Sequence, residues 1–439
     1  MHPRNPYRIP PDFRQLAKAY PPLEPCLISH EEGASSIDFR DKDSQRRLTE
    51  ALLHRDFGIS LDIPANRLCP PVPNRLNYVL WIQDLTSSTE RLLGSRPVLG
   101  MDIGTGASAI YPLLCCKLNP DWSLIATDVD KVSLNSARSN VEKNGLLERI
   151  QVYETNPEAP IFAPLHEDPN ARVDFTMCNP PFYSSHEDVA ASADTKEFEP
   201  NAVCTGADVE MITPGGESSF VQRMVDESIQ LKDRCQWYTS MLGKMSSVTE
   251  VVGVLREHAI ENYGITEFVQ GSTRRWAVAW SFSDFRLPDA IARIANPQLQ
   301  ALMPPRNPLR QPFQFPEPDI HRLTEILSAV LASVDGARVV KADTSDASRF
   351  IISATKNTWS RGARRKQKQS AEDLPATEQF APNLVCCVRW IIPDVSQGGQ
   401  TETYLECQWV QGRDRPLFEA FSSHVSRKAT AALHPAPAP

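Results

Sequence analysis

The segment Cys178–Tyr183, with the sequence CNPPFY, combines the groups needed to activate an aromatic amine. An exocyclic amine is a poor nucleophile, because its lone pair is delocalised into the ring. The side-chain oxygen of Asn179 and the main-chain carbonyl oxygen of Pro180 can accept its two hydrogens. This moves the nitrogen toward tetrahedral geometry and frees the lone pair for in-line attack on a methyl donor. No side-chain base is required, because the proton can leave after the transfer.

The other residues of this segment suit the same task. Pro180 and Pro181 fix the loop, so the acceptors need not be ordered during the reaction. Phe182 offers a face on which an unpaired base can stack. Asn-Pro-Pro-aromatic after a strand is typical of methyltransferases that act on N6 of adenine or on related amines, so we predict Asn179, Pro180, Pro181 and Phe182 as catalytic residues. The alternative is a proline-rich turn that only ends a strand, which chance places in about one chain in a hundred.

A glycine-rich turn predicts a nucleoside cofactor. The segment Asp102–Ser108, with the sequence DIGTGAS, follows an apolar run and precedes a predicted helix. Glycines there let the main chain approach a ligand, and the helix offers unpaired N–H groups. Asp128 ends the next predicted strand, where an acid accepts hydrogen bonds from ribose hydroxyls. The dinucleotide pattern is incomplete, because residue 109 is Ala, and a tight turn with a capping Asp is the alternative. The predicted cofactor residues here are Asp102, Gly104, Thr105, Gly106, Ser108 and Asp128.

An alternating series of elements must position these two segments. Apolar runs predict strands, and helical spacing between them predicts helices on both faces of an open parallel sheet. The predicted strands are 98–104, 123–128, 149–154, 173–179 and 236–242, the predicted helices are 44–57, 75–94, 107–118, 131–145 and 218–231, and a terminal β-hairpin is predicted at 265–271 and 275–282. The sequence therefore predicts an α/β fold with both motifs at the carboxyl edge of the sheet.

Composition and the order of predicted elements indicate five segments, which are a basic N-terminal arm at 1–43, an α/β domain at 44–285, a proline-rich linker at 286–318, a smaller C-terminal α+β domain at 319–430 and a tail at 431–439. The 37 prolines against 19 glycines favour rigid connections. Within the C-terminal domain, a polar, basic loop at about 360–380 is expected to be disordered.

The charge pattern restricts nucleic-acid binding to local patches. The formal net charge is -8, so the whole chain is not a basic coat for a polyanion. The stretch 361–368 carries five cations and no acid. For each single cation the alternative is a solvated surface side chain. The candidate RNA contacts are Arg4, Arg8, Arg14, Lys18, Lys244, Arg274 and Arg275.

Cysteine spacing and hydropathy favour an intracellular protein. The ten cysteines include no C-x-x-C pair, so no metal site is expected. We interpret them as reduced thiols in the cytosol or nucleus. The N-terminal segment has no apolar core, and no apolar run is long enough to span a bilayer. We therefore expect a soluble protein that binds no metal and no membrane.

The sequence resembles the family of U6 spliceosomal RNA adenosine N6-methyltransferases (methyltransferase-like protein 16 type), as a fungal-like member. The resemblance runs nearly continuously from residue 1 to about 283 through the segments MHPRNPYRIPPDF, DFGISLDIP, PNRLNYVLWIQDL, DIGTGASAIYPLL, CNPPF, WYTSMLGK and RRWAVAWSF. It implies a Rossmann-like class I S-adenosylmethionine-dependent methyltransferase with an N-terminal RNA-binding arm. It also implies S-adenosylmethionine as methyl donor, and an adenosine in an ACAGA-type sequence of U6 snRNA as target. In some members the target is also structured messenger RNA.

Roles carried over by matching motif extend the site. The resemblance implies that Arg75, Gly104, Ser108, Asp128 and Asn179 contact the cofactor. From the residues alone, Arg75 is either a surface cation or a clamp on the cofactor's carboxylate. The resemblance further implies that 179–182 holds the adenine and that Arg275 and Lys244 face RNA. It implies a monomer that acts in the nucleus, with the cytoplasm as a second location.

The sequence departs from the family at several positions. Residue 128 is Asp where Glu is expected, and either acid can bind a ribose. Residues 272 and 245 are Ser and Met where cations are expected, and Arg274 can compensate for the first. The loop after the motif is acidic here, which favours a lid or an autoinhibitory flap over a cationic RNA clamp. Its acids are Glu187, Asp188, Asp194, Glu197, Glu199, Asp208 and Glu210.

Two rival hypotheses remain at this stage. An enzyme of the same fold could methylate adenine in ribosomal RNA or DNA, or a glutamine side chain, because such enzymes share the NPPF motif. A non-catalytic RNA-binding scaffold is the second rival, and the intact cofactor turn argues against it. The C-terminal domain is expected to add RNA affinity, with a protein-interaction module as the alternative.

Overall fold

The computed structural model describes residues 1–30, 35–94, 96–189, 206–271, 273–315, 318–341, 348–360, 363, 382–392 and 401–434. The chain divides into two compact units. The first unit contains Met1–Ser283 and Arg293–Pro304, and the second contains Asp284–Ala292 and Pro305–Pro439.

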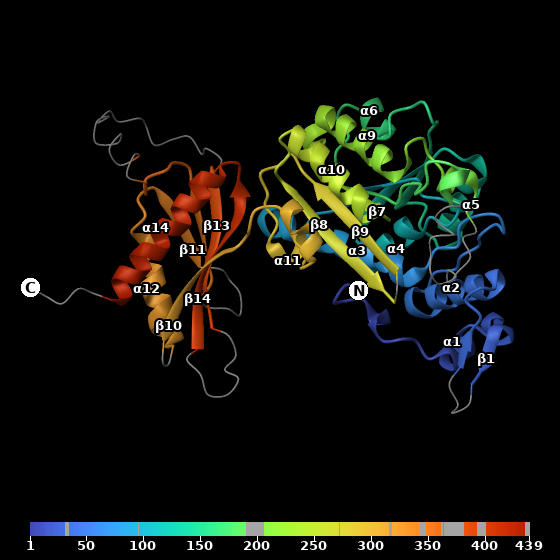
Figure 1. The fold of residues 1–439 in the computed structure, drawn as a ribbon, viewed down its shortest axis with the longest axis horizontal. Coiled ribbons are helices and arrows are strands. Elements are labelled where there is room, and N and C mark those ends of the chain that lie inside the picture. Colours follow the sequence, from blue (N-terminus) through green and yellow to red (C-terminus); the bar gives the residue numbers. More distant parts are fainter. Residues whose placement is uncertain are drawn as a thin grey trace, which may run out of the picture. The chain divides into compact units, whose positions relative to one another are not determined.

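A seven-stranded sheet forms the centre of the first unit (Figure 1). The strand order is β5-β4-β3-β6-β7-β9-β8. Neighbours from β5 to β7 are parallel, whereas β9 runs antiparallel to both β7 and β8. This order confirms the predicted α/β fold and its terminal hairpin. The strands are β3 (Val98–Ile103), β4 (Trp122–Asp128), β5 (Ile150–Glu154), β6 (Val173–Cys178), β7 (Cys235–Leu242), β8 (Tyr263–Gln270) and β9 (Thr273–Trp280).

Helices cover both faces of this sheet. α3 (Val72–Leu93) packs with α4 (Ile110–Leu118) near one face, where α5 (Lys131–Lys143) also lies against β4 and β5. α9 (Gly216–Leu231) packs with α10 (Met245–Glu257) on the other, and Figure 1 shows these two helices side by side. Shorter elements connect them, namely α6 (Ala163–Glu167), α8 (Asp208–Met211), η4 (Lys232–Arg234) and η5 (Pro297–Leu302).

The N-terminal arm is folded onto the first unit. It contains η1 (Pro6–Arg8), α1 (Phe13–Ala19), η2 (Pro21–Cys26), β1 (Leu27–Ser29) and β2 (Ser35–Ile37), and α2 (Lys42–Phe57) follows. The buried Asn5 side chain donates to Asn77 Oδ1 at 2.8 Å, and the Tyr7 hydroxyl donates to Asp56 Oδ2 at 2.7 Å. Buried hydrogen bonds of this kind fix the path of the arm from its first turn.

The second unit is a five-stranded antiparallel sheet with two main helices. The strand order is β10-β14-β13-β12-β11, and α12 and α14 pack together against the sheet around an apolar core. The elements are α11 (Asp289–Ala292), β10 (Leu309–Phe315), α12 (Ile320–Ala332), β11 (Ala337–Lys341), β12 (Phe350–Ala354), β13 (Leu384–Ile391), β14 (Thr401–Gly412) and α14 (Arg415–Leu433). The expected loop at about 360–380 lies almost entirely outside the described residues.

The predicted linker at 286–318 differs from the structure. Residues 309–315 form the edge strand β10, which pairs with β14 along its whole length. Arg293–Pro304 instead belongs to the first unit. Pro312 is compatible with β10 because an edge strand needs hydrogen bonds on one side only. The abundance of proline hid the alternation of Phe313 and Phe315, which face the core of the second unit.

Gly100 allows the close packing of two central strands. It lies on β3 opposite Phe175 of β6, and a Cβ atom at Gly100 would overlap the Phe175 ring. That ring also contacts Trp122, with ring centroids 5.1 Å apart, so it has little room to move. β3 and β6 lead directly into the two predicted motifs, and their spacing therefore depends on Gly100.

The substitution Gly100→Ala is expected to lower the free energy of unfolding by about 1–3 kcal/mol, as overpacking of a filled core does. Gly253→Ala is the matched control, because a Cβ atom at Gly253 in α10 meets nothing within 4 Å. This control should raise stability by about 0.5–1 kcal/mol, as alanine does in helices. Urea denaturation measures both changes. Equal effects of the two substitutions would contradict the packing argument.

Candidate active site

The glycine turn at the end of β3 and the acid at the end of β4 form one hydrogen-bonded unit. Gly104 and Gly106 have φ angles of +69° and +64°, which side chains other than glycine rarely adopt. The Gly106 N–H donates to Asp128 Oδ2 at 2.8 Å, and the Asp130 N–H donates to Oδ1 at 2.9 Å. Burial raises the pKa of Asp128, which is 8% exposed, and these N–H groups oppose that rise. The carboxylate is held in place while part of its acceptor capacity remains.

A cavity of about 580 Å³ lies above these strand ends. Its walls also include Leu68, residues 155–161, Phe220 and Arg223. Asp102 and Phe182 do not line it. The predicted residues that it brings together are Arg75, Gly104, Thr105, Gly106, Ser108, Asp128, Asn179, Pro180 and Pro181.

Asn179 presents an unsatisfied acceptor to this cavity. Its Oδ1 atom is buried and accepts no hydrogen bond within the described part of the chain. Buried polar atoms are normally paired, so an unpaired oxygen in a cavity wall indicates a place for a donor on a ligand. Cys178, one residue earlier, donates its N–H to the Tyr78 hydroxyl at 3.3 Å, and this hydroxyl also bonds to Thr239 at 2.6 Å. The motif is therefore held from below by a buried polar network.

Phe182 lies beside a cation from β9. The guanidinium carbon of Arg275 on β9 lies 5.4 Å from the centroid of the Phe182 ring. Burial lowers the pKa of Arg275, and so does the nearby charge of Arg75. The buried Glu217 accepts the main-chain N–H groups of Gly243 and Lys244 at 2.7 and 2.8 Å, which fixes the loop next to Phe182. The predicted stacking residue thus has one aromatic face near a cation that interacts favourably with it.

Arg75 and Asp102 are buried on the inner side of the site. Arg75 is 6% exposed, and its guanidinium donates to the Tyr111 hydroxyl at 3.0 Å. Asp102 is fully buried, and neither carboxylate oxygen has a hydrogen-bond partner among the described residues. Burial raises the pKa of Asp102 to about 7. Asp102, which precedes the glycine turn on β3, is therefore neutral over much of the acidic range.

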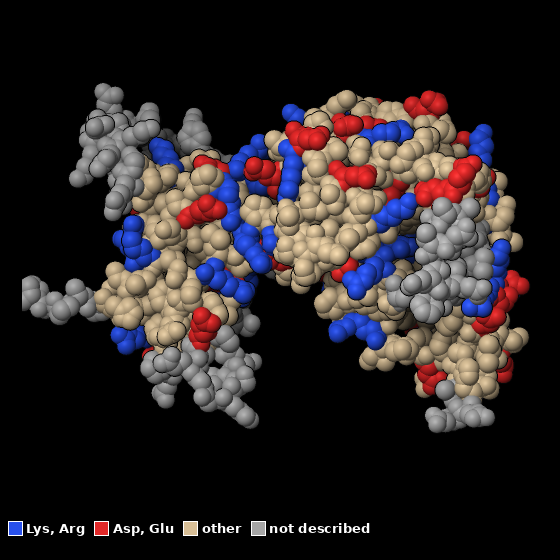
Figure 2. Space-filling model, in the orientation of Figure 1, with Lys and Arg blue, Asp and Glu red and all other residues tan. Residues whose placement is uncertain are grey.

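The cations of the N-terminal arm have different surroundings. Arg4 donates to Asp84 Oδ1 at 2.6 Å and to the Leu80 carbonyl oxygen at 3.0 Å, so it anchors the arm on α3. Arg8, Arg14 and Lys18 are exposed. Figure 2 shows a group of Lys and Arg side chains near the place where Figure 1 marks the N-terminus. The structure thus gives Arg4 a structural role that the sequence did not predict.

The two other predicted RNA contacts pair with acids. Lys244 Nζ lies 3.3 Å from Asp188 Oδ2 and 6.0 Å from the centroid of the Tyr183 ring. Arg274 lies 3.1 Å from Glu267. Both cations remain about half exposed, and such surface pairs are worth little and exchange easily for other charges.

The acidic segment after the motif is described only at its ends, because Asp194, Glu197 and Glu199 lie outside the described residues. Ser272, between β8 and β9, also lies outside them. Glu187 and Asp208 are exposed. Glu210 instead lines the cavity. The sequence did not single out Glu210 or Leu68 as site residues, because no local pattern distinguishes an acid that points inward from one that points to solvent.

Among the described residues, no group of three or more His, Cys, Asp or Glu side chains could hold a metal ion. No described helix has the length and apolar character needed to cross a bilayer.

Sequence comparison finds relatives along most of the chain. The model of a family described as RNA methyltransferase matches residues 1–284. The chain is 36% identical to the RNA N(6)-adenosine-methyltransferase mettl16 of Danio rerio, over 95% of this chain and 94% of that protein. It is 35% identical to the U6 small nuclear RNA (adenine-(43)-N(6))-methyltransferase of Schizosaccharomyces pombe, over 91% of this chain and 97% of that protein.

Solved structures resemble the first unit. The human METTL16 catalytic domain in complex with MAT2A 3'UTR hairpin 1 is 41% identical, with a TM-score of 0.59, over 65% of this chain and 96% of that chain. The N-terminal domain of human METTL16 in complex with SAH is also 41% identical, with a TM-score of 0.54, over 65% of this chain and 99% of that chain.

The raised pKa of Asp102 predicts a pH-dependent stability. The folded chain holds a proton on Asp102 up to a pH of about 7, whereas the unfolded chain releases it near the ordinary value of 3.8. Between these values the free energy of unfolding of the wild type should fall, on the order of 1.4 kcal/mol per pH unit for this group. Asp102→Asn removes this pH dependence. The free energy of unfolding of the variant minus that of the wild type should therefore grow from pH 5 to pH 7 and level off near pH 8. Urea denaturation at each pH measures it, and parallel curves would refute the assignment.

Proposed function

The chain belongs to the RNA methyltransferase family, and we propose that it transfers a methyl group from S-adenosylmethionine to N6 of an adenosine in U6 snRNA. The relative from Schizosaccharomyces pombe, which is named for adenine 43 of U6, aligns with nearly its whole length. The second relative is named for the same modification of RNA. The reaction class is therefore an S-adenosylmethionine-dependent N6-adenosine methylation of RNA.

One observation carries the proposal. The unpaired Oδ1 atom of Asn179 lies in the wall of the same cavity as the glycine turn and Asp128. An amide oxygen in this place can accept one hydrogen of the adenine amine, and the carbonyl oxygen of Pro180 can accept the other. These acceptors are preorganised, because the two prolines restrict the loop and Tyr78 holds the preceding residue.

The residues of the cavity fit S-adenosylmethionine. Asp128 has remaining acceptor capacity for ribose hydroxyls, and the positive φ angles of Gly104 and Gly106 open the turn to a ligand. Arg75 is the buried cation for the cofactor's carboxylate, whereas Asp102 is buried without lining the cavity and acts on the cofactor only through the glycine turn that it begins. When bound, S-adenosylmethionine supplies the electrophilic methyl group. Thr105 and Ser108 complete the cofactor wall.

Phe182 and the cations hold the RNA. Phe182 stacks on the target adenine, and the guanidinium of Arg275 stabilises the Phe182 ring by lying over it. Lys244 and Arg274 exchange their acidic partners for phosphates, and the exposed arm cations Arg8, Arg14 and Lys18 extend the contact, with Arg4 holding the arm in place. We further propose that the protein acts as a monomer in the nucleus, and that the second unit adds RNA affinity.

Methyl transfer to RNA tests the proposal directly. The full chain should transfer label from S-adenosylmethionine to a U6 hairpin that contains ACAGA, and no label should reach the same hairpin with the central adenosine changed to uridine. A structured messenger RNA hairpin is a second substrate to compare, because the human relative was crystallised with MAT2A 3'UTR hairpins. Label on ribosomal RNA or DNA alone would replace the proposed substrate, and cofactor binding without any transfer would favour a scaffold.

Asn179→Ala tests the role of the amide oxygen. The substitution removes one of two acceptors of the amine, so kcat should fall by at least about 100-fold, as loss of a preorganised electrostatic group does. RNA affinity should change less than about twofold, because the phosphate contacts remain. The matched control is Asn170→Ala, since Asn170 is an exposed asparagine of the same unit. A variant at residue 179 that keeps most of its turnover would contradict the mechanism.

A further inference from the structure

Glu210 places a carboxylate in the cofactor cavity from a short helix that does not belong to the sheet. It lies on α8, and its Oε1 atom is 3.6 Å from the place that a Cβ atom on Gly106 would take. It lines the same cavity as Asp128, and the two carboxylates are close enough for their charges to interact. Two acids therefore face one wall of the glycine turn.

The main chain fixes one oxygen of Glu210 and leaves the other available. Oε2 accepts the N–H of Ala207 at 2.8 Å and the N–H of Leu68 at 3.1 Å. Oε1 accepts no hydrogen bond from any residue that the structure describes. Because both donors converge on Oε2, the carboxylate is oriented with Oε1 toward the cavity. This is the arrangement of a held acceptor, and a solvated surface acid would not show it.

The segment that carries Glu210 is also tied to the NPPF motif. The Tyr183 N–H donates to the Met211 carbonyl oxygen at 2.9 Å, and the Thr213 N–H donates to the Tyr183 carbonyl oxygen at 2.9 Å. Tyr183 directly follows Phe182. Glu210 thus connects the segment beside the base-stacking residue with Leu68, which also lines the cavity.

Two facing carboxylates in a partly closed cavity are unfavourable without a donor between them. Burial raises the pKa of both Asp128 and Glu210. The charge of Asp128 raises the pKa of Glu210 further, whereas the N–H groups of Ala207 and Leu68 and the charge of Arg67 oppose this rise. A vicinal diol offers two O–H donors and no charge, so it can bridge two carboxylates and offset their loss of water.

We propose that Glu210 is a cofactor-binding residue whose Oε1 atom, like Asp128 beside Gly106, accepts a hydrogen bond from the ribose hydroxyls of S-adenosylmethionine. This inference rests on the proposed function, because it concerns the same cofactor. It adds to the site an acid from the segment after the motif, so ribose binding and the position of the base-stacking loop share one side chain.

The substitution Glu210→Gln keeps the two hydrogen bonds that hold the side chain and removes only the Oε1 acceptor. The amide oxygen must take the Oε2 position to satisfy the two N–H groups, so the amide nitrogen replaces the Oε1 acceptor with a donor. The affinity of the full chain for S-adenosylhomocysteine, measured by isothermal titration calorimetry, should fall roughly tenfold or more, the range for a charge-assisted hydrogen bond. The affinity for 5′-methylthioadenosine should fall by the same factor, because this probe keeps the ribose and lacks the amino-acid part.

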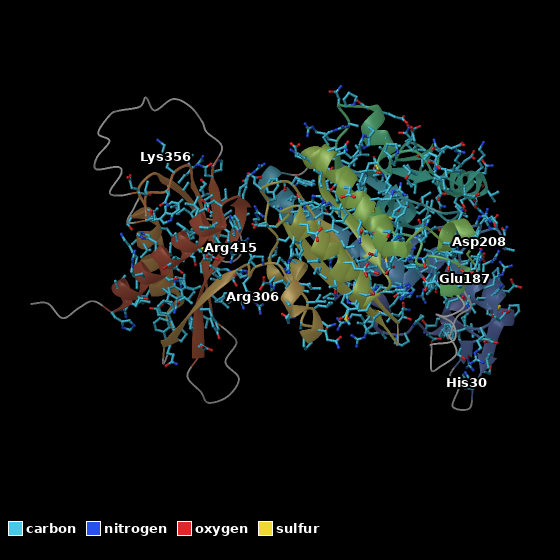
Figure 3. The ribbon with its side chains drawn as sticks, turned by 45° about the horizontal axis from the view of Figure 1, so that its top comes forward. His30, Glu187, Asp208, Arg306, Lys356 and Arg415 are labelled. Atoms are coloured by element: carbon cyan, nitrogen blue, oxygen red, sulfur yellow. The ribbon has the colours of Figure 1, made fainter. Side chains whose placement is uncertain are left out.

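The control variant is Asp208→Asn, which removes the same charge from the same short helix. The Asp208 side chain is 72% exposed, lies 3.5 Å from His186 and does not line the cavity, and Figure 3 shows it at the surface near Glu187. It should leave both affinities within about twofold of the wild type. Asp128→Asn is the positive reference and should weaken both probes.

Three outcomes decide between the alternatives. Wild-type affinity of Glu210→Gln for both probes overturns the inference and leaves the proposed function intact. Weakened binding of S-adenosylhomocysteine alone overturns the ribose assignment, because the contact then lies at the amino-acid part. A folded wild-type chain that binds neither probe overturns the proposed function itself, and that result is read before any variant is compared.

Discussion

The pairing of Ile103 on β3 with Cys178 on β6 determines where donor and acceptor meet. The chain leaves β3 into the glycine turn and leaves β6 into Asn179, so both loops start from neighbouring strand ends on one edge of the sheet. The connection after β3 leads to α4, and the connection after β6 leads to α9 on the other face. Loops that diverge in this way leave a crevice between them, as in other open α/β sheets. The cavity is therefore a consequence of strand order, and the side chains around it only adapt it to one cofactor.

Local patterns in the sequence were enough to predict the parts of the site that lie at strand ends. Apolar runs predicted β3, β4 and β6, and Asp128 and Asn179 follow from where those runs stop. Glu210 could not be found in this way, because its side chain is held by the main-chain N–H of Leu68, which lies 142 residues earlier in the chain. Arg4 was predicted to bind RNA from its charge alone, since its partner Asp84 is visible only in the folded chain. The strand β10 was missed because a proline count does not distinguish a linker from an edge strand.

The electrostatics of the first unit separate two tasks. Two acids, Asp128 and Glu210, line the cavity beside the glycine turn, whereas Asp102 is buried without lining it, and burial raises the pKa of all three. A positively charged sulfonium donor complements such a cavity better than the neutral thioether that remains after transfer. Arg75 and Arg223 also line the cavity, whereas the predicted RNA-binding cations lie on β9, on the loop after β7 and on the arm. A chain with a net charge of -8 can therefore bind RNA through a local surface while its interior is acidic.

One helix, α3, contacts the cavity, the strand before Asn179 and the N-terminal arm. Arg75 and Tyr78 are three residues apart on α3 and share a face, from which Arg75 reaches the cavity and Tyr78 reaches the strand before Asn179. Asn77 and Asp84 are seven residues apart and share another face, where they accept hydrogen bonds from the arm. Because α3 is one continuous helix, the position of the arm and the position of the strand before Asn179 are fixed relative to each other. This explains why the first unit includes the arm as a folded element: its hydrogen bonds bear on the same helix that supports the reacting groups.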